Sequence, residues 1–237
     1  MQAKRILNFL RQVAANNNRD WFANHKNEYL ACKEDFEMGV EKAIQRIALF
    51  DSHVASQKAK DCCYRFYRDT RFSEDKSPYK RHFGAYICER GRKSLRAGYY
   101  LHLQPGHSFI SCGSYWLPTN ILTACRNELM ANIDEWRKCV ENGQFIKYFG
   151  YPGNGSLDME EEFSEKGFGI SMLKTCPKDF PRDYEFIQYL RMKDYAVWHR
   201  VDDDFFKGDG WLEDIDRMFR VAQPLNHFLN AVIADYD

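Results

Sequence analysis

The sequence predicts an α+β fold in which a central antiparallel sheet, at about residues 62–113, is flanked by N-terminal and C-terminal helices. Apolar residues recur at helical spacing before residue 50 and again after residue 117. Short runs of strand-forming residues, separated by turn signals, fill the interval between them. Helices, then strands, then helices are typical of an α+β domain, so we expect residues 1–237 to form a single domain.

The N-terminal part has the periodicity of three helices. Residues 3–15 form an amphipathic pattern, residues 20–29 carry aromatic side chains on one face, and a longer apolar stripe ends near residue 50. Asn16 to Asn18 separate the first two helices and offer a side chain that caps the second. The polar residues 51–60 are expected to form a loop.

The predicted sheet is built around a hairpin. Residues 62–67 and 83–88 are rich in strand formers, and an ordered loop over 69–80 joins them. A second pair of strands flanks the turn Gln104–His107. If Pro105 and Gly106 are its two loop residues, residue 102 pairs with residue 109 and residue 100 with residue 111. One face of this hairpin is then apolar enough to be core: Tyr99, Leu101, Leu103, Ile110 and Cys112.

The C-terminal half alternates between helices and short strands. In this half, the spacing of the apolar residues predicts the helices and strands, and the turn residues between them set their bounds. We expect a long helix over 117–142, a short helix over 144–149, an acidic stretch over 158–165, a strand over 168–173, a helix over 181–190, a strand over 195–201, and a final helix over 212–233 that is interrupted near Pro224.

The charges are unevenly distributed. The chain has no net charge, so it is not built as a polyanion binder as a whole. Residues 60–96, however, hold eleven Lys or Arg and only five Asp or Glu. The densest stretch is RFYRDTRFSEDKSPYK, residues 65–80. Arginine is suited to bidentate contact with phosphate or carboxylate, so this stretch predicts a site for a small phosphorylated or carboxylated ligand.

Ten residues make up the predicted ligand-binding site. Lysines would add point charges, aspartates would hold the arginines in place, and a tyrosine and a histidine on the hairpin would supply proton transfer. No catalytic residue or metal site is assigned, the cofactor is unknown, and an enzyme and a non-catalytic protein both stay open. The ten residues are Arg65, Arg68, Asp69, Arg71, Asp75, Lys76, Tyr79, Lys80, Tyr100 and His102.

A structural interpretation of the same stretch competes with the ligand site. Asp69 with Arg68 or Arg71, and Asp75 with Lys76, would form an internal salt-bridge network that only pins a long loop. The protein would then be a non-catalytic binding module whose basic segment contacts an acidic protein or nucleic acid, with nucleic acid the less expected partner.

Three motifs resemble a known family. They carry basic or aromatic residues at fixed spacing, and the resemblance extends over nearly the whole chain. They are Asn17-Asn18-Arg19-Asp20-Trp21-Phe22; Arg65-x-x-Arg68-Asp69-Thr70-Arg71-Phe72 with Asp75-Lys76-x-x-Tyr79; and Leu173-Lys174-x-x-Pro177-Lys178 with Leu190-Arg191-x-Lys193.

The chain is similar in these motifs to a mostly bacterial family of conserved hypothetical proteins, domain of unknown function 2461. The hairpin residues Gly98-Tyr99-Tyr100 with Pro105-Gly106 resemble the same family. The chain departs from its pattern at Asp179 and Tyr184, where a Gly and a His are expected. The resemblance implies no activity, because none is established for the family.

The cysteines and the apolar runs bear on the compartment. Eight cysteines show no C-x-x-C pair and no zinc-finger spacing, which is typical of free thiols in a reducing cytosol. The first ten residues do not resemble a signal peptide, and no apolar run approaches a membrane span of about 18 residues. We therefore expect a cytoplasmic protein without membrane contact.

Overall fold

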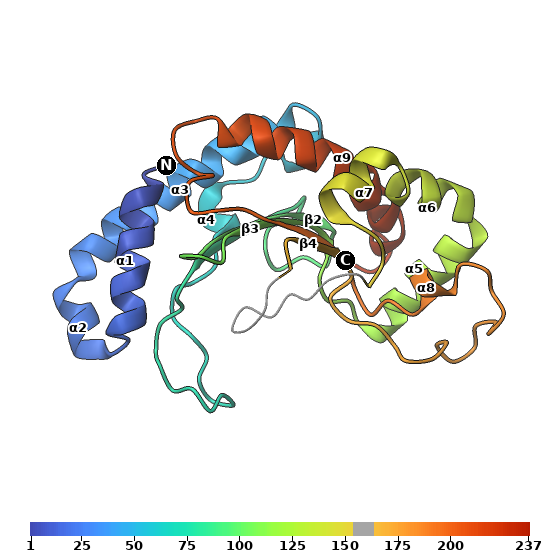
Figure 1. Ribbon diagram of the computed structural model, residues 1–237, viewed down its shortest axis with the longest axis horizontal. Helices are drawn as coiled ribbons and strands as arrows, with labels where there is room; N and C mark the ends of the chain where they lie inside the picture. Colours follow the sequence, from blue (N-terminus) through green and yellow to red (C-terminus); the bar gives the residue numbers. More distant parts are fainter. Residues whose placement is uncertain (154–163) are drawn as a thin grey trace.

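The hairpin predicted around Pro105 and Gly106 lies in the sheet of the computed structural model, which describes residues 1–153 and 164–237 (Figure 1). Within these residues the sheet has five antiparallel strands in the order β1-β2-β3-β5-β4. They are β1 (Phe83–Ile87), β2 (Gly98–Leu103), β3 (Phe109–Ser114), β4 (Lys166–Phe168) and β5 (Tyr195–Arg200). The predicted α+β class is confirmed.

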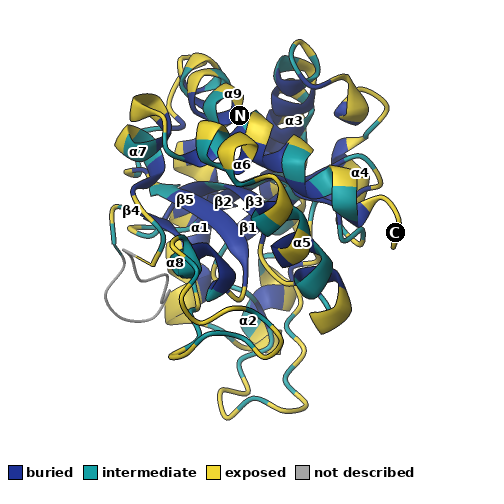
Figure 2. Ribbon diagram, turned by 90° about the vertical axis from the view of Figure 1, so that its right-hand side faces the viewer, coloured by how far each residue is buried: buried dark blue, intermediate teal, exposed yellow. Residues whose placement is uncertain are grey.

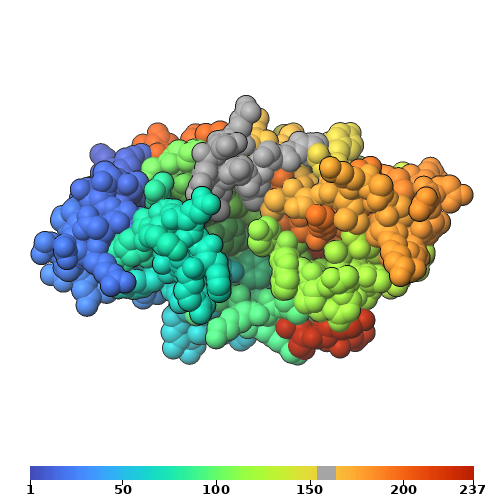
Figure 3. Space-filling view, turned by 90° about the horizontal axis from the view of Figure 1, so that it is seen from below, coloured from blue at the N-terminus to red at the C-terminus, as the bar shows by residue number. Residues whose placement is uncertain are grey.

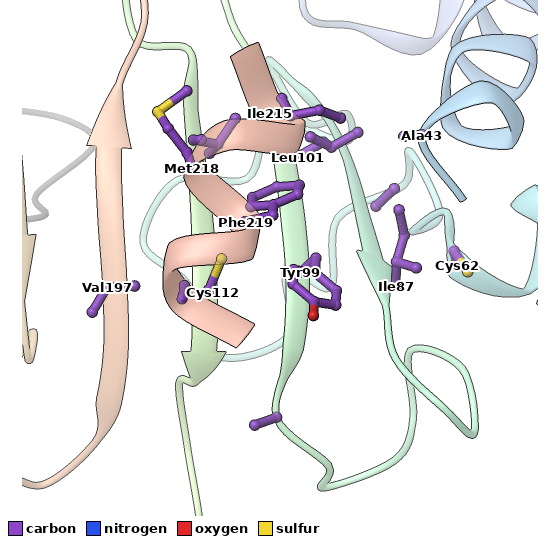
Figure 4. Packing of buried hydrophobic residues seen from close by; sticks show 14 of the residues in the cluster. Ala43, Cys62, Ile87, Tyr99, Leu101, Cys112, Val197, Ile215, Met218 and Phe219 are labelled. Atoms are coloured by element: carbon purple, nitrogen blue, oxygen red, sulfur yellow. The ribbon is translucent and has the colours of Figure 1, made fainter. Parts of the chain in front are cut away.

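The register of the hairpin is the predicted one. Tyr100 pairs with Ser111, and His102 pairs with Phe109. Because side chains alternate along a strand, all five residues of the predicted core face are buried together. Figure 4 shows this face, with Tyr99 of β2 directed at the final helix, where its ring lies 5.0 Å from that of Phe219.

Two long helices cover that face of the sheet, α3 in contact with β1 and α9 in contact with β3 (Figure 1). Buried residues from α1 through α9 belong to one continuous hydrophobic cluster, and the strands are almost entirely buried (Figure 2). The helices are α1 (Ala3–Ala15), α2 (Arg19–Asn24), α3 (Lys26–Ala48), η1 (Ser52–Val54), α4 (Ala59–Cys62), α5 (Thr119–Ala131), α6 (Ile133–Val140), α7 (Gly143–Phe149), α8 (Ile187–Leu190) and α9 (Trp211–Ile233).

The opposite face of the sheet looks into a hollow. Figure 1 shows the chain around residues 64–80 descending on one side of the sheet, and α5 with the 171–186 segment on the other. Seen from below, the surface is hollowed between these two sides (Figure 3). The molecule therefore presents its open concave side between two separate groups of loops.

Several predicted elements differ from the structure. The helix predicted over 117–142 is two helices that meet at Asn132. The final helix is not interrupted at Pro224, because α9 runs through it. The ring removes one N–H from the helix ladder, but the apolar face of α9 is buried on both sides of the proline.

Short elements account for the remaining differences. The predicted strand over 62–67 begins with the end of α4 and continues as extended chain joined only by isolated bridges. The helix predicted over 181–190 is reduced to α8, and the strand predicted over 168–173 ends at Phe168. Most of the acidic stretch 158–165 lies outside the described residues. In the described ranges, no helix is long and apolar enough to cross a membrane.

Candidate functional site

The first predicted site residues lie on a two-armed extension, residues 64–80, called here the 64–80 hairpin. Its arms are joined by the amide of Arg68 donating to the carbonyl of Pro78 and the amide of Lys80 donating to the carbonyl of Phe66, both at 2.9 Å. The Tyr79 ring is buried and stacks on Phe22 with centroids 3.9 Å apart. Tyr79 therefore anchors the hairpin to the N-terminal helices by packing.

Arg68 is occupied by the hairpin itself. Its side chain is half-buried, and Nη1 donates to the carboxylate of Asp75 and to the hydroxyl of Ser77. Nη2 donates to the hydroxyl of Ser73 at 3.3 Å. Hydrogen bonds from the backbone and hydroxyl of Ser77, followed by that of Arg68, hold the pKa of the Asp75 carboxyl well below its usual range. This network closes the tip of the hairpin.

The other cations of the hairpin have separate partners. Arg71 and Asp69 form an exposed bidentate pair, with Nε to Oδ1 at 3.0 Å and Nη2 to Oδ2 at 2.7 Å. The Arg71 hydrogen bonds lower the pKa of Asp69 to about 2. Lys76 donates to the carbonyl of Thr70 at 3.0 Å. Arg65 is exposed and makes no hydrogen bond within the ranges that the structure describes.

Lys80, Tyr100 and His102 come together at the open face of the sheet. The Tyr100 hydroxyl lies 2.9 Å from Nδ1 of His102, and Nε2 of His102 lies 3.0 Å from Oε1 of Gln104. Since the Gln104 oxygen only accepts, His102 carries its proton on Nε2 and accepts from Tyr100 at Nδ1. The Lys80 ammonium lies 5.3 Å from the ring centroid of Tyr64, and burial, followed by the charge of Arg65, lowers the pKa of Lys80.

His102 is fully buried between two rings. Its imidazole stacks on Phe109 with centroids 4.5 Å apart and lies tilted against His82 with centroids 4.2 Å apart. Burial lowers the pKa of His102 to about 4, so the ring is neutral at pH 7. The structure thus brings three of the ten predicted residues into one cluster, while Arg68 and Arg71 are bound to separate carboxylates.

A cavity that the sequence did not predict lies on the other side of the hollow. Called here the basic cavity, it has a volume of about 570 Å³ and is bounded by residues 115–126, 171–178 and 193–194. The side chain of Asp194 shapes its wall. This buried carboxylate accepts hydrogen bonds from the backbone N–H of Ile170 and of Ser171, both at 2.9 Å. Burial nevertheless raises the pKa of Asp194.

Three cations line the basic cavity. Arg126 of α5 is buried; its Nη2 donates to the carbonyl of Met192 at 2.8 Å, while its Nε has no hydrogen-bond partner among the described residues. Burial lowers the pKa of Arg126. Lys178 and Lys193 are exposed, and neither forms an ion pair within the described ranges. The cavity is therefore lined by three cationic side chains and by one carboxylate, that of Asp194, which backbone amides hold in place.

The mouth of the basic cavity also carries aromatic surface. Tyr115 and Trp116 are 70 % and 68 % exposed, in the loop between β3 and α5. Exposed large rings beside a polar cavity are suited to contact with a planar or apolar group. Hydroxyl groups of Thr119 and Thr175 line the same space. The arrangement can hold an anionic group in the cavity and an attached ring at its mouth.

Comparison with known proteins places the chain in a family. A family model described as a conserved hypothetical protein, DUF2461, matches residues 5–228. The chain belongs to the DUF2461 family. No curated protein and no solved structure matches it.

The motifs on which the sequence resemblance rests lie in two places. Those around Asn17 and residues 65–79 build the hairpin, where the Asn17 amide donates to the carbonyl of Tyr79 at 2.9 Å. The later basic motif borders the basic cavity. Pro177 and Lys178 line it, and Arg191 supports its wall by donating from Nε to the carbonyl of Leu173 at 2.8 Å.

One signal for the basic cavity was present in the sequence. Arg126 lies four residues after Leu122 and three before Leu129, so a charged residue occupies the apolar stripe of a predicted helix. A buried arginine needs polar partners, so this position was a usable signal that the sequence analysis did not take up. The spatial neighbours of Arg126, Lys178 and Lys193, belong to other segments and could not be paired with it from spacing.

Proposed function

We propose that this DUF2461 protein binds a small phosphorylated or carboxylated ligand in the basic cavity. The observation that carries the proposal is the set of charged side chains that line the basic cavity. Arg126, Lys178 and Lys193 border a cavity of about 570 Å³ whose carboxylate, Asp194, is held by backbone amides. Fixed donors and an excess of cationic side chains over carboxylates favour a ligand with two or more negative oxygens.

In this proposal the guanidinium and the ammonium groups contribute to binding in different ways. Arg126 is anchored to the carbonyl of Met192 and is held rigidly, so little side-chain entropy is lost when it contacts an anion. Lys178 and Lys193 are exposed and add mobile point charges at the rim. The ring of Trp116 is placed to cover a planar part of the ligand, such as a nucleobase. No reaction is assigned.

An anion site on the 64–80 hairpin stays a prediction. The internal pairs Arg68–Asp75 and Arg71–Asp69 favour the alternative in which the cluster is a structural salt-bridge network. A macromolecular contact through this basic segment would neutralise many phosphates, so its affinity would fall about 10³-fold or more between 50 and 200 mM salt. A small ligand held by three cations loses much less.

Calorimetric titration tests the proposal. Adenosine diphosphate, a sugar phosphate, inorganic phosphate and a dicarboxylate are titrated into the wild type and into Lys178→Ala, Lys193→Ala and Arg71→Ala. We expect at least one phosphorylated compound to bind, with each lysine change weakening binding by about fivefold or more and Arg71→Ala leaving it unchanged. Lys93→Ala, in an exposed turn, is the matched control. Loss of binding in Arg71→Ala alone would place the site on the hairpin.

We also propose a reducing, cytoplasmic location. All eight cysteines lie in the described ranges and are free thiols, and five of them are buried in the core. Burial raises the pKa of several of these thiols, which keeps them protonated and unreactive. Such residues are suited to a compartment where thiols stay reduced.

A further inference from the structure

Potential metal ligands converge at a third place, where α9 crosses the end of α3. Asp51 follows α3 and caps η1, His53 lies in η1, and His227 lies on α9. Oδ1 of Asp51 is 3.0 Å from Nδ1 of His53 and 3.8 Å from Nε2 of His227. All three ligand atoms lie within 4.8 Å of one another.

The carboxylate of Asp51 is fixed by the core. The buried hydroxyl of Tyr99, on β2, donates to Oδ2 of Asp51 at 2.8 Å. One carboxylate oxygen is thereby oriented by a phenol, and the other faces the two imidazoles. Orienting partners of this kind are typical of carboxylates that bind metal ions.

His227 is placed by the residues on either side of it. Asn226 accepts from the backbone N–H of Gly113 at 2.9 Å, and Asn230 accepts from the backbone N–H of Ala97 at 2.7 Å. These bonds fix this stretch of α9 against the ends of β2 and β3. The backbone of His227 is therefore held in place before any ion binds, which reduces the entropy lost on binding.

We propose that Asp51, His53 and His227 bind a divalent transition-metal ion such as Zn²⁺. Ligand atoms about 2.0–2.1 Å from a tetrahedral zinc ion lie roughly 3.3 Å apart, so small rotations of the two exposed imidazoles complete the geometry. Two histidines with one carboxylate are ligands that such ions prefer. A simple hydrogen bond between Asp51 and His53 accounts for one short distance, but it does not account for the approach of His227 to the same oxygen.

Three protein ligands leave one coordination position of a tetrahedral ion open to a non-protein group. A cavity of about 210 Å³ adjoins the three side chains, and Glu89 and Arg96 line its wall. Three protein ligands and an adjoining cavity are typical of metal centres with a position open to water or to an oxygen ligand. This site lies apart from the basic cavity, since the two share no lining residue.

Zinc binding to the full chain tests the proposal. The protein, free of any histidine tag and pretreated with a chelator, is titrated with zinc chloride at pH 7.5 in a calorimeter. We expect one ion per chain with a dissociation constant below about 10 µM. His53→Ala and His227→Ala should each weaken binding by about tenfold or more. Both side chains are exposed, so circular dichroism should show that both variants fold.

A histidine outside the cluster supplies the control. His25 is not one of the three proposed ligands, and its ring stacks on Trp21. His25→Ala should therefore bind zinc as the wild type does. Absence of saturation up to about 1 mM zinc would overturn the proposal. An affinity for zinc that either His53→Ala or His227→Ala retains at the wild-type value would also overturn it, because the ion would then be held by other groups such as the thiols.

Discussion

At the scale of single residues, His102 shows how burial sets a protonation state. Its pKa of about 4 lies below the unfolded value of about 6.5. Between these pH values the unfolded chain binds the extra proton, so the free energy of unfolding decreases as the pH falls from 6.5 towards 4. From pH 7 to pH 4.5 this residue alone accounts for a loss of about 2–3 kcal/mol.

His102→Gln tests this protonation state. Glutamine can replace the hydrogen bonds of the imidazole but does not titrate, so the variant should lose less stability on acidification than the wild type. We expect the difference in free energy of unfolding between the two proteins to shrink by about 2–3 kcal/mol between pH 7 and pH 4.5. Urea denaturation at both pH values measures it. A difference independent of pH would show that His102 is not held neutral.

Asp179 explains a departure from the family pattern. Its φ of 68° lies in the left-handed region, which a side chain disfavours, and the family resemblance leads us to expect a glycine there. We expect Asp179→Gly to raise the free energy of unfolding by up to about 1 kcal/mol and Asp179→Val to lower it by about 1–2 kcal/mol. The exposed neighbour in Asp183→Gly, which lacks a positive φ, should instead lose stability. Urea denaturation distinguishes these signs, and equal losses in both glycine variants would contradict the explanation.

At the scale of elements, the 64–80 hairpin is held by Arg68 and not by Arg71. Arg68 is half-buried and bonds to three side chains, so Arg68→Ala leaves several groups without their partner and should cost about 1–2 kcal/mol. Arg71 and Asp69 are exposed, and Arg71→Ala should have no measurable effect on stability. Urea denaturation and the rate of proteolysis within residues 64–80 measure both; equal sensitivity of the two variants would show that the network around Arg68 does not close the hairpin.

Elements whose boundaries are local could be predicted from the sequence. Pro105 and Gly106 specify the turn, and the turn sets the register of β2 and β3. The break at Asn132 could not be predicted, because Leu129, Ile133 and Trp136 continue the apolar stripe across it. Continuity of α9 through Pro224 depends on tertiary packing, which overrides the local preference of proline.

The candidate sites show the same limit. Residues 65–80 are contiguous, so their charge was visible, but the partner of each arginine depends on how the hairpin closes. The basic cavity takes Arg126 from a helix and its lysines from two distant segments. The metal-ligand cluster joins Asp51 and His53 to His227 only because α9 folds back over the sheet. Sequence spacing carries no information about such pairs.

At the scale of the whole molecule, the helices α3 and α9 cover one face of the sheet, and the other face looks into the hollow between two groups of loops (Figure 3). The chain has no net charge, so attraction of an anion depends on local fields and not on overall charge. On the hairpin, Arg68 and Arg71 are each paired with a carboxylate, whereas Lys178 and Lys193 of the basic cavity form no ion pair within the described ranges. The central claim is that an anion binds in the basic cavity and not at the 64–80 hairpin.

Amide chemical-shift mapping of the ¹⁵N-labelled protein tests that claim most directly. A phosphorylated ligand found by titration is added, and the backbone amides that shift are assigned. We predict saturable shifts at Ser171, Leu173 and Lys193, which border the basic cavity, and none at Thr70 or Ser77 of the hairpin. Saturable shifts at the hairpin amides, with the amides around Lys193 unmoved, would contradict the account.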